Sequence, residues 1–346
     1  MASARPAHPA LLDTLRRLCE TDGPPGREGG VRRSVRAELK SASLRTQVSP
    51  LGSLYAADGS TRGARVMLAA HLDEVGLVVS HVDGHGLAWL HPLGGLRAAE
   101  CSGAELRFAH GVLAVLGCAS TSLPTEHPPR LLADFGPRPP DLPVRTGSMG
   151  VFATPWQVEG NLARGKALDN RVGVALALHA ALGSRKRANS MLLALTTLGQ
   201  VGQRAAPAAA AELSPDAILT LGVLALTDRR EPETTQAHAG RGPAIVVRTP
   251  VFVGDGRLTE TLVETAARAR LPHQVVLASH NPTGAEEMQS ALGGIPTATV
   301  LVPATGVGTP AQAVDLRDLR VALELLVRVL DRPWAHGGSG TGGLGP

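Results

Sequence analysis

Aromatic residues are scarce in this chain of 346 residues: tryptophan, tyrosine and phenylalanine together make up 2% of it, with a single tyrosine. A hydrophobic core must therefore be built from leucine, valine and alanine. Hydrophobic residues reach 43% of the chain, which is ordinary for a globular protein. The length predicts one large or two medium domains with a sizeable core.

Cysteine is nearly absent as well, with only Cys19, Cys101 and Cys118, widely spaced. They form no Cys-x-x-Cys pair and are odd in number, so neither a zinc ribbon nor a disulfide framework is indicated. We expect buried, reduced thiols in a cytoplasmic protein. No apolar run approaches the roughly 20 residues that span a bilayer, and no signal peptide is recognisable, so we expect no membrane association.

The chain also lacks a concentrated charge of either sign. Its net charge of +4 is spread along the sequence, and the densest basic cluster is Arg185, Lys186 and Arg187. That cluster is short and has no aromatic residues near it, which is typical of a solvated loop. Because nucleic-acid binding usually needs a basic face or a known motif, we expect no nucleic-acid partner.

Hydrophobic spacing and helix breakers predict the order of the elements. Apolar residues at helical spacing indicate helices over residues 10–21 and 28–39, followed by short strands over 51–56 and 65–70. Helix and strand then alternate from residue 160 to residue 332, which indicates an α/β fold with a mostly parallel sheet sandwiched by helices. Between them, residues 75–159 consist of short strand-like segments and are predicted to form a small inserted β domain. The α/β domain is therefore discontinuous (1–74 and 160–332), and the glycine-rich end, 333–346, is predicted to be a flexible tail.

Two short stretches resemble pieces of a metal site. In "AAHLDEVG", His71 and Asp73 follow an apolar strand and share one face of it, so Asp73 can hold the ring of a metal-binding His71. In "GKALDNRVG", Asp169 precedes a helix, where it can be either a helix cap or a carboxylate bridging two metals. Either stretch alone is weak evidence. A histidine beside an acid at a strand end is more often a surface pair than a ligand, and Asp169 or Asn170 taken alone is better explained as a helix cap.

Together they resemble the tetrahedral and glutamyl, or deblocking, aminopeptidases, a family of di-metal enzymes with relatives once labelled endoglucanases. Further landmarks occur in the same order along nearly the whole chain: "LGSLYA", "MLAAHLDEVGLVV", "LLADFG", "GKALDNRVGVALAL", "GRGPAIVV" and "GGIPTATVLVP". The resemblance implies a zinc-peptidase-like α/β domain with an inserted β-barrel that mediates dimerisation. It also implies that His71 ligates one metal, that Asp169 bridges two, that Asp73 orients His71, and that the Asp169–Asn170 peptide bond is cis.

The pattern breaks in "MLLALTTLGQVGQ". At this point the family carries two adjacent glutamates, the general base and a metal ligand, before a Val-Gly pair. With the pair at Val201 and Gly202 as the anchor, those two positions hold Gly199 and Gln200. Neither residue can act as a base, and the amide of Gln200 is a poor metal ligand.

Two further ligand positions are also altered. Counting back from Asp228 places Gly222 where the family has an aspartate ligand, and "PATGVGTPAQ" places Gly308 where it has a histidine ligand and Gln312 where it has a glutamate. Only His71 and Asp169 then remain of five expected ligands.

Because a catalytic zinc normally has three protein ligands, we predict that no metal cofactor is held. Neutral residues would also spare an empty site the repulsion of clustered carboxylates. Asp169 could then pair with His71 or Arg171.

One alternative is a rebuilt site in which Asp216 or Asp228 and His238 or His280 supply displaced ligands. It would leave an active metallo-aminopeptidase, using zinc, cobalt or manganese to remove N-terminal residues from peptides. A hydrolase with different chemistry is a third hypothesis, but no Gly-x-Ser-x-Gly elbow or other nucleophile arrangement is present to support it.

The favoured hypothesis is a non-catalytic binding or assembly subunit. By the resemblance, its partners would be further copies of itself in a dimer or a dodecameric shell, an active paralogue in a mixed shell, or a peptide held in the residual pocket.

Overall fold

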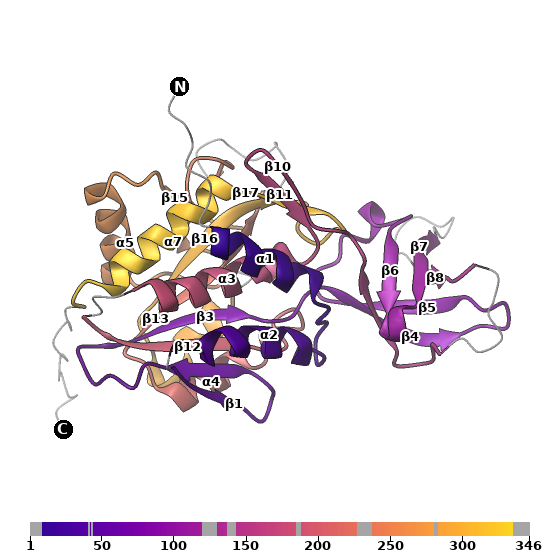
Figure 1. Cartoon of the computed structure of the whole chain (residues 1–346), viewed down its shortest axis with the longest axis horizontal. Helices are drawn as coiled ribbons and strands as arrows, with labels where there is room; N and C mark the ends of the chain where they lie inside the picture. The colour runs from indigo at the N-terminus through magenta and orange to yellow at the C-terminus, as the bar shows by residue number, and fades with distance from the viewer. Residues whose placement is uncertain are drawn as a thin grey trace.

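The computed structural model describes residues 9–40, 42, 44–119, 130–136, 143–184, 188–226, 237–279 and 283–334. The basic cluster at 185–187, Asp228, His280 and most of the predicted tail lie outside these ranges. The described chain forms two lobes, a larger body around one sheet and a smaller barrel beside it (Figure 1). None of the helices in these ranges is long and apolar enough to cross a membrane.

The body contains an eleven-stranded mixed sheet. Its four central strands, β12, β3, β13 and β16, run parallel, and the strands that flank them pair in the antiparallel sense. The strands in spatial order are β1 (Arg45–Val48), β2 (Leu54–Ala57), β12 (Ser190–Thr196), β3 (Arg65–His71), β13 (Ala217–Ala225), β16 (Thr297–Thr305), β17 (Gln312–Asp315), β11 (Leu162–Gly165) and β10 (Gln157–Glu159), with β14 (Ala244–Arg248) on β16 and β15 (Gln274–Leu277) on β14. The predicted α/β class is confirmed, with a sheet that is parallel at its centre.

Alternation along the strands supplies apolar side chains to both faces of the sheet. On β3, Val66 and Leu68 enter one core and Met67 and Ala69 enter another, because successive strand residues point to opposite faces. The first core is shared with α1 (Pro9–Glu20), α2 (Gly29–Lys40), α3 (Leu168–Gly183), α5 (Gly256–Arg268) and α7 (Leu316–Leu330). The second core is shared with α4 (Ala206–Leu213) and α6 (Ala285–Gln289). Helices therefore cover both faces, as the sequence predicted.

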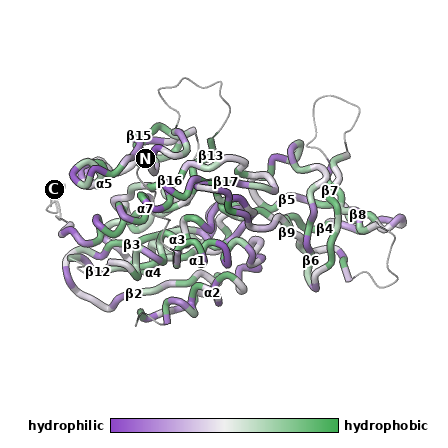
Figure 2. Tube along the Cα trace, turned by 45° about the horizontal axis from the view of Figure 1, so that its top comes forward, coloured by the Kyte–Doolittle hydropathy of each residue, from purple (hydrophilic) through white to green (hydrophobic). Residues whose placement is uncertain are grey.

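The second lobe is a closed six-stranded barrel, the inserted β-barrel that the sequence implied. Its strands in order around the barrel are β4 (Gly76–Val82), β5 (Ala88–Leu93), β8 (Arg130–Asp134), β7 (Leu113–Ala119), β6 (Glu105–Phe108) and β9 (Met149–Phe152). It has a core of its own, and the two lobes remain distinct in the turned view (Figure 2). The strand β10, expected within the inserted segment 75–159, pairs instead with β11 in the large sheet.

Candidate functional site

The residues singled out from the sequence gather at one edge of the large sheet, which we call the candidate site. His71 is the last residue of β3, Gly199 and Gln200 follow β12, and Asp169 lies in the first turn of α3. The carboxyl ends of parallel strands meet at this edge, which is where open α/β sheets bind their ligands. The two motifs, about a hundred residues apart in the chain, are thus brought together.

His71 lies between two aspartates. Its Nδ1 is 3.3 Å from Oδ1 of Asp73, and its Nε2 is 3.6 Å from Oδ1 of Asp169. Burial alone would lower the pKa of this imidazole, but the two carboxylates outweigh it and raise the pKa to about 10. In the chain without a metal, the two carboxylates thus favour the protonated form of the imidazole.

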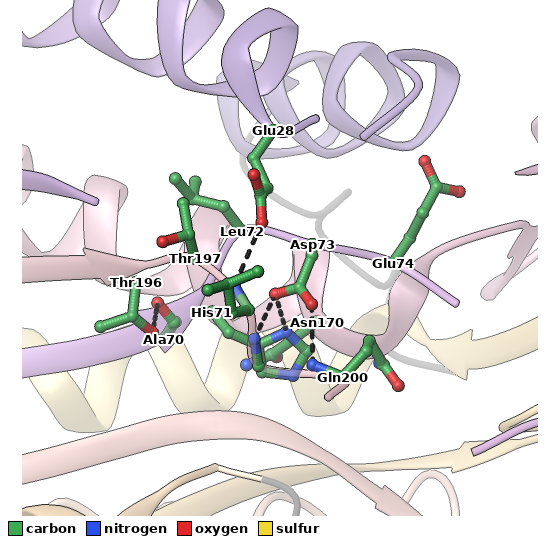
Figure 3. Close-up of polar contacts among 12 residues, drawn as sticks. Glu28, Ala70, His71, Leu72, Asp73, Glu74, Asn170, Thr196, Thr197 and Gln200 are labelled. Atoms are coloured by element: carbon green, nitrogen blue, oxygen red, sulfur yellow. Dashed lines mark hydrogen bonds and ion pairs between the residues drawn. The ribbon is translucent and has the colours of Figure 1, made fainter. Parts of the chain in front are cut away.

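Asp73 holds the loop after β12 in place. Its carboxylate is fully buried and accepts a hydrogen bond of 2.8 Å from the backbone N–H of Gly199. It accepts a second, of 2.7 Å, from the backbone N–H of Gln200 (Figure 3). Burial acts to raise the pKa of Asp73, but His71 and these N–H groups lower it below its ordinary value. Asp73 thus positions His71 and also holds Gly199 and Gln200, which stand where the resemblance implied two glutamates.

Two side-chain amides bind Asp169, one at its carboxylate and the other at its backbone N–H. Its Oδ2 accepts a hydrogen bond of 2.9 Å from the side-chain N–H of Gln200, and its backbone N–H donates to Oε1 of Gln312 at 2.8 Å. The Asp169–Asn170 peptide bond is cis, as the resemblance implied. Gln312 was placed by the sequence at an altered family position, but its hydrogen bond to Asp169 was not foreseen.

The three glycines at the positions where the resemblance implied a base or a ligand differ in the room that they leave for a side chain. A Cβ built on Gly199 would lie 2.3 Å from Cγ of His71. At Gly222 it would lie 3.0 Å from Cγ2 of Thr283, and at Gly308, where φ is +80°, it would lie 2.4 Å from the carbonyl oxygen of Gly95. Neighbouring groups have therefore closed over Gly199 and Gly308, whereas at Gly222 the side chain of Thr283 would have to give way by a few tenths of an ångström.

Arg171 does not pair with Asp169, which corrects one of the two partners suggested from the sequence. Its guanidinium is fully buried and lies 3.3 Å from Oε1 of Glu74, and it also donates to the backbone oxygen of Leu72. Lys166, only 2% exposed, binds both oxygens of Glu74 and one oxygen of Asp22. A buried ionic network thus stands beside the candidate site. One signal for this network was present in the sequence, because Glu74, Lys166 and Arg171 all lie in the two motifs.

The same network reaches the barrel. Arg107, on β6, makes two hydrogen bonds to the carboxylate of Asp22, at 2.8 and 2.6 Å. Asp22 precedes α2 in the body, so its carboxylate joins the two lobes. We call the group formed by Asp22, Arg107 and Lys166 the lobe junction.

The side chains present do not fit a di-metal centre. Oδ1 of Asp169 is buried without a hydrogen-bond partner and could accept a cation, but within the described ranges no three histidine, cysteine, aspartate or glutamate side chains are grouped to hold a metal. Catalytic zinc sites need three protein ligands, and here the side chain that would be third, Gln200, uses its N–H group to bind Asp169.

The alternative ligands suggested from the sequence do not supply the missing third ligand. Asp216 immediately precedes β13 and accepts from the backbone of Arg65, the first residue of β3, so it lies at the opposite end of these strands. His238 donates its backbone N–H to Gln274, the first residue of the edge strand β15. The other two candidates, Asp228 and His280, are outside the described part of the chain.

The architecture is that of a peptidase-type α/β body carrying an inserted barrel. The family model described as M42 glutamyl aminopeptidase matches residues 52–129 and 139–325, and the chain belongs to this family. It is 23% identical over 339 residues to the lysyl aminopeptidase of Pyrococcus furiosus, covering 92% of this chain and 96% of that protein.

Solved structures agree with this assignment. An aminopeptidase of the archaeon Desulfurococcus kamchatkensis superposes with a TM-score of 0.86 at 26% identity, covering 94% of this chain and 95% of that one. The TET1 peptidase of Pyrococcus horikoshii, described as assembling into a tetrahedron or a large octahedral shell, superposes with a TM-score of 0.78 at 19% identity, covering 92% and 99%. At that identity the second likeness shows the shared fold alone.

Proposed function

We propose that this chain is a family member that has lost the di-metal centre and the catalytic base and acts as a non-catalytic binding or assembly subunit. The observation that carries the proposal is the position of His71 against Gly199. The imidazole occupies the space in which a side chain of residue 199 would start, so no base could stand there without moving the imidazole. General-base chemistry needs such a group within hydrogen-bond reach of the attacking water.

The contacts of the remaining polar groups support the same proposal. Each ring nitrogen of His71 faces a carboxylate, Nδ1 that of Asp73 and Nε2 that of Asp169. The N–H group of Gln200 points at Asp169, where a metal ligand would present oxygen. The internal charges are thus balanced by protein groups alone.

A role in assembly is supported by the fold. The closed barrel is a separate lobe with its own core, and a related TET1 peptidase of this architecture is described as forming shells. We propose a homo-oligomer, either a dimer or a shell, or a mixed assembly with an active paralogue. A peptide held at the candidate site would be a ligand rather than a substrate.

Elemental analysis tests the loss of the metal centre directly. The protein, purified without chelators and then incubated with zinc, cobalt or manganese, is expected to carry no stoichiometric metal and to hydrolyse no aminoacyl-anilide. An active family member treated in parallel is the positive control. Stoichiometric metal together with turnover that is lost in His71→Ala would instead establish the alternative, an active aminopeptidase with a rebuilt site.

Sedimentation analysis tests the proposed assembly separately. A single species of higher mass than one chain is expected. A monomer at all concentrations would refute the homo-oligomer while leaving the loss of the metal centre standing.

A further inference from the structure

A cleft of about 950 Å³ opens beside the lobe junction, on residues that the proposed function does not use. We call it the junction cleft. Its walls come from both lobes: the loop between α1 and α2 of the body, and β6, β9 and the turn before β9 of the barrel. Clefts between lobes are common positions for small-molecule sites.

The charged side chains of this cleft are nearly all basic. Arg27, Arg107, Arg145 and His110 line it, and Asp22 is the one acidic residue among the described lining residues. The carboxylate of Asp22 is already neutralised by Arg107 and by Lys166. The cleft therefore presents an excess of positive charge to any ligand that enters it.

Two of the arginines are available to a ligand. The side chains of Arg27 and Arg145 are exposed and make no hydrogen bond or ion pair within the described ranges. An arginine guanidinium suits carboxylate and phosphate groups, because its N–H groups match two oxygens at once.

Both arginines stand on turns that are fixed by hydrogen bonds. In the turn that carries Arg145, the backbone N–H of Arg145 donates to Oγ of Ser148, and the N–H of Gly147 donates to the carbonyl of Val79. Thr146 adds a bond to the carbonyl of Ser80, so this turn is tied to β4.

On the body side, the N–H of Arg27 donates to the carbonyl of Pro24. The buried carboxylate of Glu28 accepts from the N–H groups of Gly26 and Leu198. Because hydrogen bonds already hold both turns, less backbone freedom is lost when a ligand binds, which favours affinity.

The floor of the cleft is apolar. Pro24, Phe108, Val144 and Val151 are buried residues that line it, and Met149 lines it with partial exposure. A small inorganic ion would leave this surface uncovered, whereas a ligand with an apolar portion would bury it.

We propose that the junction cleft binds an organic anion, whose carboxylate or phosphate group is held by Arg27 and Arg145 and whose apolar portion packs on the floor around Phe108. The site is separate from the candidate site and requires no metal. It takes residues from both lobes, so binding would also strengthen the contact between body and barrel.

Methyl NMR with isotope-labelled methionine tests this in the full chain. The chain has five methionines. Of the four in the described ranges, Met149 alone lines the cleft, while Met67, Met191 and Met288 are buried in the body. The probes are 3-phenylpropionate and phenylphosphate, compared with the neutral 3-phenylpropanol. Saturable shifts of the Met149 methyl signal with one or both acids are expected, with the signals of the three buried methionines unchanged. The acid that binds more tightly shows whether the cleft prefers a carboxylate or a phosphate group.

Arg27→Gln and Arg145→Gln are each expected to weaken binding about tenfold, since each removes a charge-assisted hydrogen bond. Both side chains are exposed, so the variants should fold, which thermal unfolding checks. Arg257→Gln, an exposed arginine on α5, is the matched control and should bind as the parent does.

The proposal is overturned if 3-phenylpropanol binds as tightly as the acids, if neither arginine variant changes the affinity, or if no acid shifts Met149 at millimolar concentration. These outcomes do not depend on metal content or turnover, so they leave the proposed loss of catalysis untouched.

Discussion

The imidazole of His71 and the backbone of Gly199 are packed so closely that a Cβ on residue 199 would lie 2.3 Å from Cγ and 2.4 Å from Cβ of the histidine. Glycine is thus required at this position by the present packing. Under the proposed function, in which glycine replaces the family's catalytic base, that substitution and the position of the imidazole would belong to one structural change.

Gly199→Ala should therefore destabilise the protein by roughly 1–3 kcal/mol, the usual cost of adding a methyl group to a filled interior. Urea unfolding measures the change. Gly95→Ala is the matched control, because a Cβ there has nothing within 4 Å, and it should change the free energy of unfolding by no more than about 0.5 kcal/mol.

The same substitution made in a His71→Gly background should cost much less, since both the ring and the Cβ of residue 71 are gone. A double-mutant cycle gives this coupling free energy. If Gly199→Ala costs the same in both backgrounds, the closeness of the two residues does not determine the choice of glycine.

Much of this arrangement could be predicted from the sequence. The two motifs brought His71 and Asp169 to the same strand edge, because residues that end a parallel strand and begin the following helix meet there. The inserted barrel and most helices also followed from periodicity and resemblance.

What could not be predicted depends on long-range packing. Lys166 and Glu74 are 92 residues apart, and Asp22 and Arg107 are 85 apart, so no local pattern records that these charges meet. The flanking strands β10, β11 and β17 are three or four residues long, too short for an alternating pattern to stand out. That Arg171 pairs with Glu74 rather than with Asp169 could likewise be seen only in the folded structure.

Gln200→Glu tests whether the amide is required by an empty site. The substitution would place a second carboxylate about where the amide now lies 2.9 Å from Oδ2 of Asp169. Two carboxylates at that separation repel each other, and a hydrogen bond is lost, so a destabilisation of about 1–3 kcal/mol is expected at neutral pH.

The measurement is urea unfolding in the presence of a chelator, so that no metal relieves the repulsion. The combined variant Asp169→Asn with Gln200→Glu is the control, since it restores one acid and one amide and should recover most of the loss. A stable Gln200→Glu single variant in chelator would show that the amide is not needed for charge balance.

Asp22 should contribute a pH-dependent stability through the lobe junction. Burial acts to raise the pKa of Asp22, but Arg107 and Lys166 lower it below its ordinary value of 3.8. Because the folded-state pKa is the lower one, the stabilisation is fully present above the unfolded pKa of about 4 and is lost as the pH falls through the folded pKa.

Asp22→Asn is accordingly expected to cost about 1 kcal/mol at neutral pH, a modest figure because the carboxylate is 38% exposed and partly screened. The difference from the parent should shrink below about pH 4, as chemical unfolding at several pH values would show. Glu159→Gln, at a side chain that is 84% exposed, is the control and should show no such trend. A difference that stays constant with pH would contradict the assignment of the junction as a charge contact.

The three thiols allow the two lobes to be followed separately. Cys19 lies in the core of the body and Cys101 in the core of the barrel, and burial raises their pKa to about 12 and about 11, so both are held as unreactive thiols. Cys118, on β7, is partly exposed. In the native protein one thiol should react readily with a disulfide reagent, and Cys118→Ser should abolish that reaction.

As urea is added, Cys19 should then report the opening of the body and Cys101 that of the barrel. With the lobe junction intact we expect the two thiols to become reactive over the same urea range, because Asp22 ties the lobes together through Arg107 and Lys166. In Asp22→Asn that tie is weakened, and Cys101 should become reactive at lower urea than Cys19. Peptide mapping of the labelled thiols measures both. Unchanged labelling in the variant would mean that the lobes are held together by other contacts.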